Sequence, residues 1–460
     1  MEPYPGSERS TRGPLPWRAA VGLSLFAASW LAGCAAAPVL PTAGESPPEA
    51  CVPSEKGGCL PVAPESDRVD LMRPTFSHPT DVTNPLHPSS DLHSAVMLGQ
   101  SGGQPFRTEI TLLPATKTIE WNGQTIEALE SQYVAYVDGR IEEVALDWYA
   151  QADDGSVWYL GEDVFNYEDG VVADTGGTWM AGRDGPGAMI MPADPQVGDV
   201  YRPENIPGVV FEEVTVRQTG QTVDGPHGPV AGAILVDELH MDGGHEEKTF
   251  APGYGEFSTG SGANLDALAL GVPADALAGP PPAELATLFS AAVDIDASVA
   301  LDEWQGAERS FDALTGAWEA YRSDGVPPLL ESRMNEELDA LGAALGARDP
   351  EQTRQAALRA AIAGLDFQLR YLPPEEIDRK RFGLWLRQVR LDADGDDAAG
   401  VAGDAAVLEW IRDRLASHWA EGVVADGDAL LAELRAAADA EDVSAASDAA
   451  VRLAALLADS

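Results

Sequence analysis

The stretch "LHMDGGHEEKTF" contains the residues of this chain whose types and spacing best suit metal chemistry. A tight turn at its "DG" pair would place His240 and His245 opposite each other across a hairpin, with Asp242 and Glu247 nearby. Two imidazoles and a carboxylate suit a divalent ion such as Zn²⁺ or Cu²⁺. A turn shifted by one residue, to "GG", would separate the histidines and leave a solvated hairpin tip. The stretch therefore carries two hypotheses, a metal site and a solvated turn.

Aromatic residues form a second candidate group. Trp148 and Trp158 lie on consecutive predicted strands, in "EEVALDWYAQADDGSVWYLGED", where they could line a cavity for a small-molecule ligand. Aromatic side chains on half-buried strands more often belong to the hydrophobic core. Both interpretations stay open at this stage.

Asp366 lies beside an apolar helical stripe, where a carboxylate could act as an acid or a ligand. Arg370 follows four residues later, which is the spacing of an ordinary ion pair on one helix. The spacing therefore predicts a structural Asp366–Arg370 pair.

Several mechanisms leave recognisable motifs, and this sequence lacks them. No predicted strand leads into a helix through a G-x-S-x-G elbow or a P-loop, and there is no H-E-x-x-H helix and no C-x-x-C pair. The sequence therefore favours a non-catalytic protein. A hydrolase that uses two carboxylates is the alternative, because such a pair has no fixed spacing to recognise.

The N-terminus indicates where the protein is sent. Three arginines precede an apolar run over residues 19–32, which is too short to span a bilayer and is typical of a signal peptide covering residues 1–33. The run ends in "LAGC", which resembles the lipobox of bacterial lipoproteins. That resemblance implies cleavage before Cys34 and attachment of lipid to its thiol, so the partner at this end would be the membrane, on its extracytoplasmic face.

Removing Cys34 leaves Cys51 and Cys59, an even pair in an exported chain, and we expect a disulfide between them. Residues 34–92 are rich in Pro, Ser, Glu and Gly, as in "PTAGESPPEAC". Such a composition buries too little apolar surface to fold alone, so it predicts a disordered tether.

Residues 93–260 show short apolar-polar alternations separated by turn dipeptides such as "NG" and "DG". This pattern predicts an antiparallel β-meander, either a sandwich or a half-barrel. The segments "ALDWYAQADDGSVWYLGED" and "APGYGEF" resemble parts of secreted bacterial β-domains of unknown function, which implies a β fold and export without implying a chemistry.

Residues 261–282 break the β pattern with Gly, Ala and three consecutive prolines, which predicts a linker. Residues 283–460 then show helical periodicity almost throughout, with short connections. The whole pattern predicts an α+β multidomain chain in which an antiparallel β domain precedes a separate α-helical bundle.

Charge narrows the choice of partner. The 460 residues include 75 acidic and 29 basic ones, for a net charge of −46. This field repels nucleic acid, which we exclude as a partner. We therefore expect a lipid-anchored protein that binds a small molecule or an envelope protein, with a divalent metal as its one candidate cofactor.

Overall fold

A computed structural model describes residues 51–323, 325–419 and 421–458 of the chain. It contains a 14-stranded antiparallel sheet followed by eight helices, which confirms the predicted α+β fold class. The predicted signal peptide and the lipidation site Cys34 lie outside the described residues.

The sheet occupies residues 94–272 as one meander. Its strands are β1 (Ser94–Ser101), β2 (Gln104–Trp121), β3 (Gln124–Val137), β4 (Arg140–Gln151), β5 (Val157–Glu168), β6 (Val171–Asp174), β7 (Trp179–Met180), β8 (Ala188–Met191), β9 (Val200–Ile206), β10 (Val210–Gly225), β11 (Gly228–His240), β12 (His245–Ala251), β13 (Gly255–Ser261) and β14 (Asn264–Val272).

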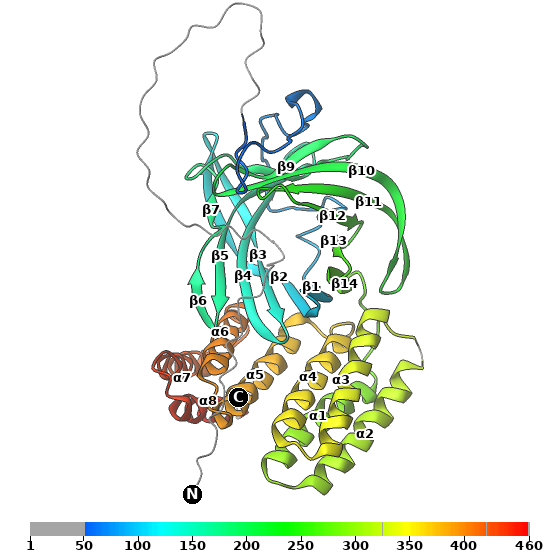
Figure 1. Ribbon diagram of the computed structural model, residues 1–460, viewed down its shortest axis with the longest axis vertical. Coiled ribbons are helices and arrows are strands. Elements are labelled where there is room, and N and C mark those ends of the chain that lie inside the picture. The colour runs from blue at the N-terminus through cyan, green and yellow to red at the C-terminus, as the bar shows by residue number, and fades with distance from the viewer. Residues whose placement is uncertain (1–50, 324, 420, 459–460) are drawn as a thin grey trace, which may run out of the picture.

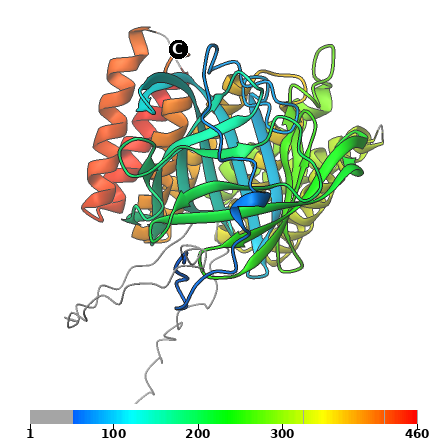
Figure 2. The same ribbon diagram turned by 90° about the horizontal axis from the view of Figure 1, so that it is seen from above.

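The strands form one curved sheet. Their order is β6-β5-β4-β3-β2-β1-β14-β13-β12-β11-β10-β9, with β7 and β8 paired to β5. β9 contacts both β5 and β8, so the two ends of the sheet approach each other. The sheet therefore curls around one of its faces instead of packing as two layers (Figures 1 and 2).

Turn chemistry explains why consecutive strands pair. Asn122 and Gly123 adopt φ values of 54° and 72° between β2 and β3, as a two-residue type I′ turn requires. Asp138-Gly139 and Asp169-Gly170 adopt the same pair of positive φ angles in the next two such hairpins. The "NG" and "DG" pairs therefore fix the register of these strands.

The helices are α1 (Ala283–Ala300), α2 (Trp304–Arg322), α3 (Pro328–Ala347), α4 (Pro350–Gln368), α5 (Pro374–Asp394), α6 (Ala398–Arg414), α7 (Glu421–Asp439) and α8 (Val443–Ala458). Three of them begin at a proline, which has no N–H to leave unsatisfied in a first turn. Among the described helices, none combines the length and the apolar composition that crossing a membrane requires.

The helices pack on the sheet face that turns away from the curl. One hydrophobic core joins α1 to α5 with β1 and β14, and a second joins α5 to α8 with β3 and β4. In Figure 1 the helices lie together below the sheet. The bundle is therefore attached to the β domain through shared cores.

The segment before β1 corrects one prediction. Residues 34–92 were expected to be a disordered tether, but residues 51–92 are placed against the sheet, with Val82 and Leu86 buried in its core. Cys51 and Cys59 are joined by a disulfide, and Val52 and Leu60 beside them pack on β10 and β11. A few apolar residues among many prolines are sufficient to hold this segment in place, because they pack on the sheet instead of forming a core of their own.

The linker prediction over residues 261–282 is also wrong in its first half. β14 covers Asn264–Val272 and pairs with both β1 and β13. Its alanines and glycine are poor strand formers, so the alternation of buried Leu268, Leu270 and Val272 was not recognised in the sequence. The β domain therefore extends twelve residues past the predicted boundary at residue 260, while α1 begins at Ala283.

Candidate functional site: an acidic cavity in the curved sheet

A cavity of about 940 Å³ lies on the face around which the sheet curls. Alternate residues of the strands point into it, as Tyr133 and Ala135 do from β3. The intervening Val134 and the next residue, Tyr136, face the helices. His87 and Leu92, from the segment before β1, complete the lining.

Acidic side chains dominate this lining. Twelve of them contribute to it, against one lysine, Lys248, and one histidine, His87. Burial lowers the pKa of His87 to about 4, so this imidazole is neutral at pH 7. The acidic lining residues are Glu55, Glu142, Glu143, Asp147, Glu162, Glu168, Glu204, Glu212, Glu238, Glu246, Glu256 and Asp266.

One group of these carboxylates has positive partners. Lys248 Nζ lies 2.6 Å from Glu238 Oε2, and His240 Nδ1 lies 3.4 Å from Glu212 Oε1. Burial opposes the charge of Glu212, but Lys248 and His240 outweigh it and lower its pKa to about 2. Burial likewise opposes protonation of His240, yet Glu212 and Glu246 raise its pKa to about 10. Burial and the charge of Glu212 raise the pKa of Glu238 to about 8.

A second group has no such partners. Glu143, Asp147, Glu162 and Glu204 are at most 9% exposed, and no lysine, arginine or histidine of the described residues forms an ion pair with any of them. Burial raises the pKa of Asp147 to about 6, although the Tyr159 hydroxyl donates to it over 2.6 Å. Burial and neighbouring acidic groups raise the pKa of the other three well above the ordinary value.

Glu162 and Glu204 lie where the two ends of the sheet approach each other. Burial raises the pKa of both carboxyl groups well above the ordinary value, and the charge of Glu162 adds to the rise at Glu204. Glu162 belongs to β5 and Glu204 to β9, the strands that approach each other where the sheet curls round. Buried carboxyl groups with raised pKa values therefore lie at the point where the sheet closes on itself.

Two further polar groups face the cavity without a partner. The hydroxyl of Tyr201 and one oxygen of Asp266 are buried and make no hydrogen bond within the described part of the chain. Burial, with the charge of Glu256, raises the pKa of Asp266 to about 7. Unsatisfied buried groups are costly, which is the arrangement expected where a ligand supplies the missing partner.

The predicted metal site is not assembled. β11 and β12 pair with Leu239 opposite His245, so His245 points to the outer face, where it contacts Asp237. His240 points to the cavity face instead. Asp242 caps the turn by accepting from the Gly244 N–H and pairs with Lys56, and Glu247 is exposed.

His240 nevertheless belongs to a group that sequence spacing could not show. One ligand atom each of Glu212, Glu238 and His240 lies within 4.8 Å of the others, close enough to hold a divalent ion. The Lys248 ammonium and the protonated imidazole already supply positive charge there. A metal would have to displace a proton from His240 and compete with Lys248.

The prediction that Trp148 and Trp158 line a cavity is wrong, because the next residue on each strand lines it instead. Both are at most 2% exposed and belong to the hydrophobic core on the other face of β4 and β5. Their neighbours Tyr149 and Tyr159 line the cavity, with the two rings stacked 4.9 Å apart.

A separate cluster of buried charge lies between the sheet and the helices. Arg107 binds Asp366 through two hydrogen bonds of 2.6 and 2.8 Å, and Arg414 reaches Glu109 over 2.8 Å. This corrects the predicted Asp366–Arg370 pair, since Arg370 instead contacts Tyr321 and His227. The full cluster consists of Arg107, Glu109, Asp366, Asp378, Arg381 and Arg414.

Comparison with known proteins adds no family to this description. No protein-family model matches the chain, and a search of curated proteins finds no match.

Proposed function

We propose that this chain is a lipid-anchored extracytoplasmic protein that binds an organic cation in its β cavity. The observation that carries the proposal is a set of buried carboxyl groups for which the chain supplies little positive charge. Buried carboxylates are costly unless they are paired. The cavity therefore keeps Glu143, Glu162 and Glu204 protonated until a cation enters and replaces those protons.

The size and lining of the cavity favour a molecule over a single ion. A volume of about 940 Å³ lies at the upper end of the range of roughly 300–1,000 Å³ for small-molecule sites. Tyr133, Tyr149, Tyr159 and Tyr201 contribute aromatic surface, to which ammonium groups are attracted. An amine with several charges and an apolar backbone combines both features.

The location rests on the N-terminal sequence. The signal-peptide pattern and the lipobox-like "LAGC" support export and attachment through Cys34. The Cys51–Cys59 disulfide is consistent with an oxidising compartment. Metabolic labelling with a radioactive fatty acid tests the anchor, because a Cys34→Ser variant should lose the label.

Calorimetric titration with spermine, a linear polyamine used as a probe, tests the binding function. We expect saturable binding at pH 7 with release of protons, measured by comparing buffers of different ionisation enthalpy. The double variant Glu162→Gln/Glu204→Gln should bind at least tenfold more weakly, about 1.4 kcal/mol.

Glu247→Gln is the matched control, because Glu247 is an exposed residue on the same strand as the cavity residues Glu246 and Lys248. It should leave the affinity unchanged. The proposal fails if spermine does not bind saturably, or if the double variant and the control bind it equally.

A carboxylate-dependent hydrolase is the second candidate. Glu212 and Glu238 have pKa values of about 2 and about 8, and a pair with separated pKa values is what acid–base catalysis uses. One carboxyl oxygen of each lies within 4.8 Å of the other, which suits an acid–base pair that acts on one substrate. A component of a cell-envelope extract that disappears with the parent but not with Glu238→Gln would favour this candidate, and equal behaviour of the two would reject it.

A further inference from the structure

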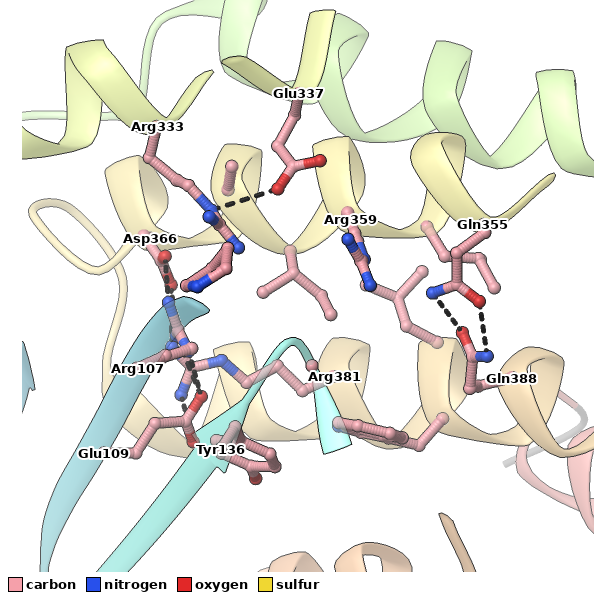
Figure 3. A pocket seen from close by; sticks show the side chains of 17 residues that line it. Arg107, Glu109, Tyr136, Arg333, Glu337, Gln355, Arg359, Asp366, Arg381 and Gln388 are labelled. Carbon is pink, nitrogen blue, oxygen red and sulfur yellow. Dashed lines mark hydrogen bonds and ion pairs between the residues drawn. The ribbon is translucent and has the colours of Figure 1, made fainter. Parts of the chain in front are cut away.

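A second, smaller pocket lies on the opposite side of the sheet from the β cavity. It is enclosed by α3, α4 and α5 together with the ends of β2 and β3, and has a volume of about 60 Å³ (Figure 3). The proposed cation site shares none of its lining residues. This helix–sheet pocket therefore needs its own explanation.

The walls of the pocket are apolar and its two ends are polar. Leu358 and Ile362 from α4 face Leu384 and Trp385 from α5. One end is closed by the side-chain amides of Gln355 and Gln388, which exchange hydrogen bonds of 3.2 and 2.8 Å. The other end is formed by the buried charge cluster, where Arg107 binds Asp366.

Arginines from three different helices converge on this space, as Figure 3 shows for Arg333, Arg359 and Arg381. Arg333 Nε pairs with Glu337 over 3.0 Å, and Arg359 donates to the backbone oxygen of Asp138 over 2.9 Å. Arg381 donates from its two terminal nitrogens to the charge cluster.

Two donors in the pocket have no acceptor. Arg359 Nε and Arg381 Nε are buried and lack a hydrogen-bond partner among the described residues. Arg381 is only 2% exposed, so bulk water does not solvate its side chain. Buried N–H groups in a lined space are normally satisfied, which indicates that an acceptor belongs there.

We propose that the helix–sheet pocket binds a short-chain organic carboxylate. A space of about 60 Å³, at roughly 10–15 Å³ for each water-sized position, takes about four to six non-hydrogen atoms. Propionate and butyrate have this size. The carboxylate head accepts from the Arg359 and Arg381 guanidinium groups, and the alkyl tail contacts Ile362 and Trp385.

Charge and apolarity together select this class of ligand. Four arginines and three carboxylates line the pocket, so it is locally positive in a chain whose net charge is −46. An amine would be repelled by the arginines. Inorganic phosphate satisfies them but leaves the apolar walls without a contact, and so binds more weakly.

Ligand-observed NMR titration of the purified protein with propionate, phosphate and propionamide tests the proposal. We expect saturable binding of propionate, at least tenfold weaker binding of phosphate, and at least tenfold weaker binding of propionamide, which has the same size but no charge for the arginines. Arg359→Gln should weaken propionate binding at least tenfold, while its spermine affinity should match that of the parent.

Two further variants keep the test decisive. Arg348→Gln is the matched control, because this arginine at the end of α3 is 63% exposed in its side chain and lies outside the pocket; it should change nothing. Should Arg359→Gln fail to fold, Arg333→Gln is expected to weaken propionate binding several-fold. Absent propionate binding, equal affinity of parent and variant, or equal affinity for phosphate would each overturn the assignment.

Discussion

The two faces of the same sheet bury charge in opposite ways. On the face toward the helices, three carboxylates meet three arginines, each within 3.4 Å of a partner: Glu109, Asp366 and Asp378 with Arg107, Arg381 and Arg414. On the cavity face, the twelve acidic side chains of the described lining have Lys248 and the protonated His240 as their positive partners, while the lining histidine His87 is neutral.

The pKa values follow this difference. Burial alone would raise the pKa of Glu109, but Arg381, Arg107 and Arg414 hold it below the ordinary value. Burial raises the pKa of Asp147 and Glu162 on the other face, where no basic side chain in the described part of the chain forms an ion pair with them. A buried acidic residue is structural where the fold neutralises it, and is available to a ligand where the fold does not.

The largest expected effect on stability comes from removing one arginine of the buried charge cluster between the sheet and the helices. Arg414 is 5% exposed and binds Glu109 and Gln132 over 2.8 and 2.5 Å. Replacing it by methionine leaves Glu109 with less positive charge in a buried site, which should lower the free energy of unfolding by about 3–5 kcal/mol. Urea denaturation followed by circular dichroism measures this change.

Arg452→Met is the control, because the Arg452–Glu433 pair is more than half exposed on both sides. Exposed pairs contribute about 0–1 kcal/mol, so this variant should unfold close to the parent. Similar losses for the two variants would show that the buried cluster has no special role in stability.

The acidic residues of the β cavity predict an unusual dependence of stability on pH. Apart from Glu212, the cavity acids whose pKa is shifted have higher values in the folded than in the unfolded chain, so above pH 4 the folded state binds more protons and loses stability as pH rises. For Asp147 the rise from 3.8 to about 6 corresponds to about 3 kcal/mol, lost between pH 4 and 7. Asp266 and Glu238 extend the window to about pH 8.

Thermal unfolding from pH 5 to pH 8 without added cations measures this loss. Asp147→Asn should flatten the dependence, because it removes one group that titrates in the window. Saturating spermine should flatten it as well. A parent protein that gains stability from pH 5 to pH 8 would contradict the assignment of the cavity acids as protonated.

Much of the fold was predictable because local rules decide it. Paired positive φ values at Asn122-Gly123 and Asp138-Gly139 need those residue types, so the hairpins followed from the sequence. The start of α1 near residue 283 followed from the three prolines before it. Apolar alternation also showed that β4 has two different faces.

The site was not predictable, because alternation does not show which face closes on itself. Glu143 and Asp147 alternate with apolar residues in β4 and have the pattern of a solvated face. The sheet curls and brings β9 to β5, so this face becomes the interior of the cavity. Trp148 and Trp158 lie on the opposite face of the same strands. Asp366 finds its partners in the same non-local way, 259 residues away at Arg107.

A comparison of the two histidines of the hairpin sharpens the contrast between the faces. His240→Ala removes the partner of Glu212 in the cavity and should lower the free energy of unfolding by about 1–3 kcal/mol at pH 7. His245→Ala alters an exposed contact with Asp237 and should stay within about 0.5 kcal/mol of the parent. Equal losses measured by urea denaturation would contradict the opposite placement of the two side chains.

The smallest expected effect concerns neighbouring aromatic residues on β5. Tyr159 donates to Asp147 in the cavity over 2.6 Å, and this bond favours the ionised carboxylate. Tyr159→Phe should therefore keep Asp147 protonated at higher pH and weaken spermine binding a few-fold, by less than about 1 kcal/mol. Trp158→Phe changes only the core behind the strand, so it should lower stability while leaving the affinity within about twofold. Because adjacent residues of one strand differ in the face they occupy, an affinity that responds to Trp158→Phe and not to Tyr159→Phe would place the ligand outside the β cavity.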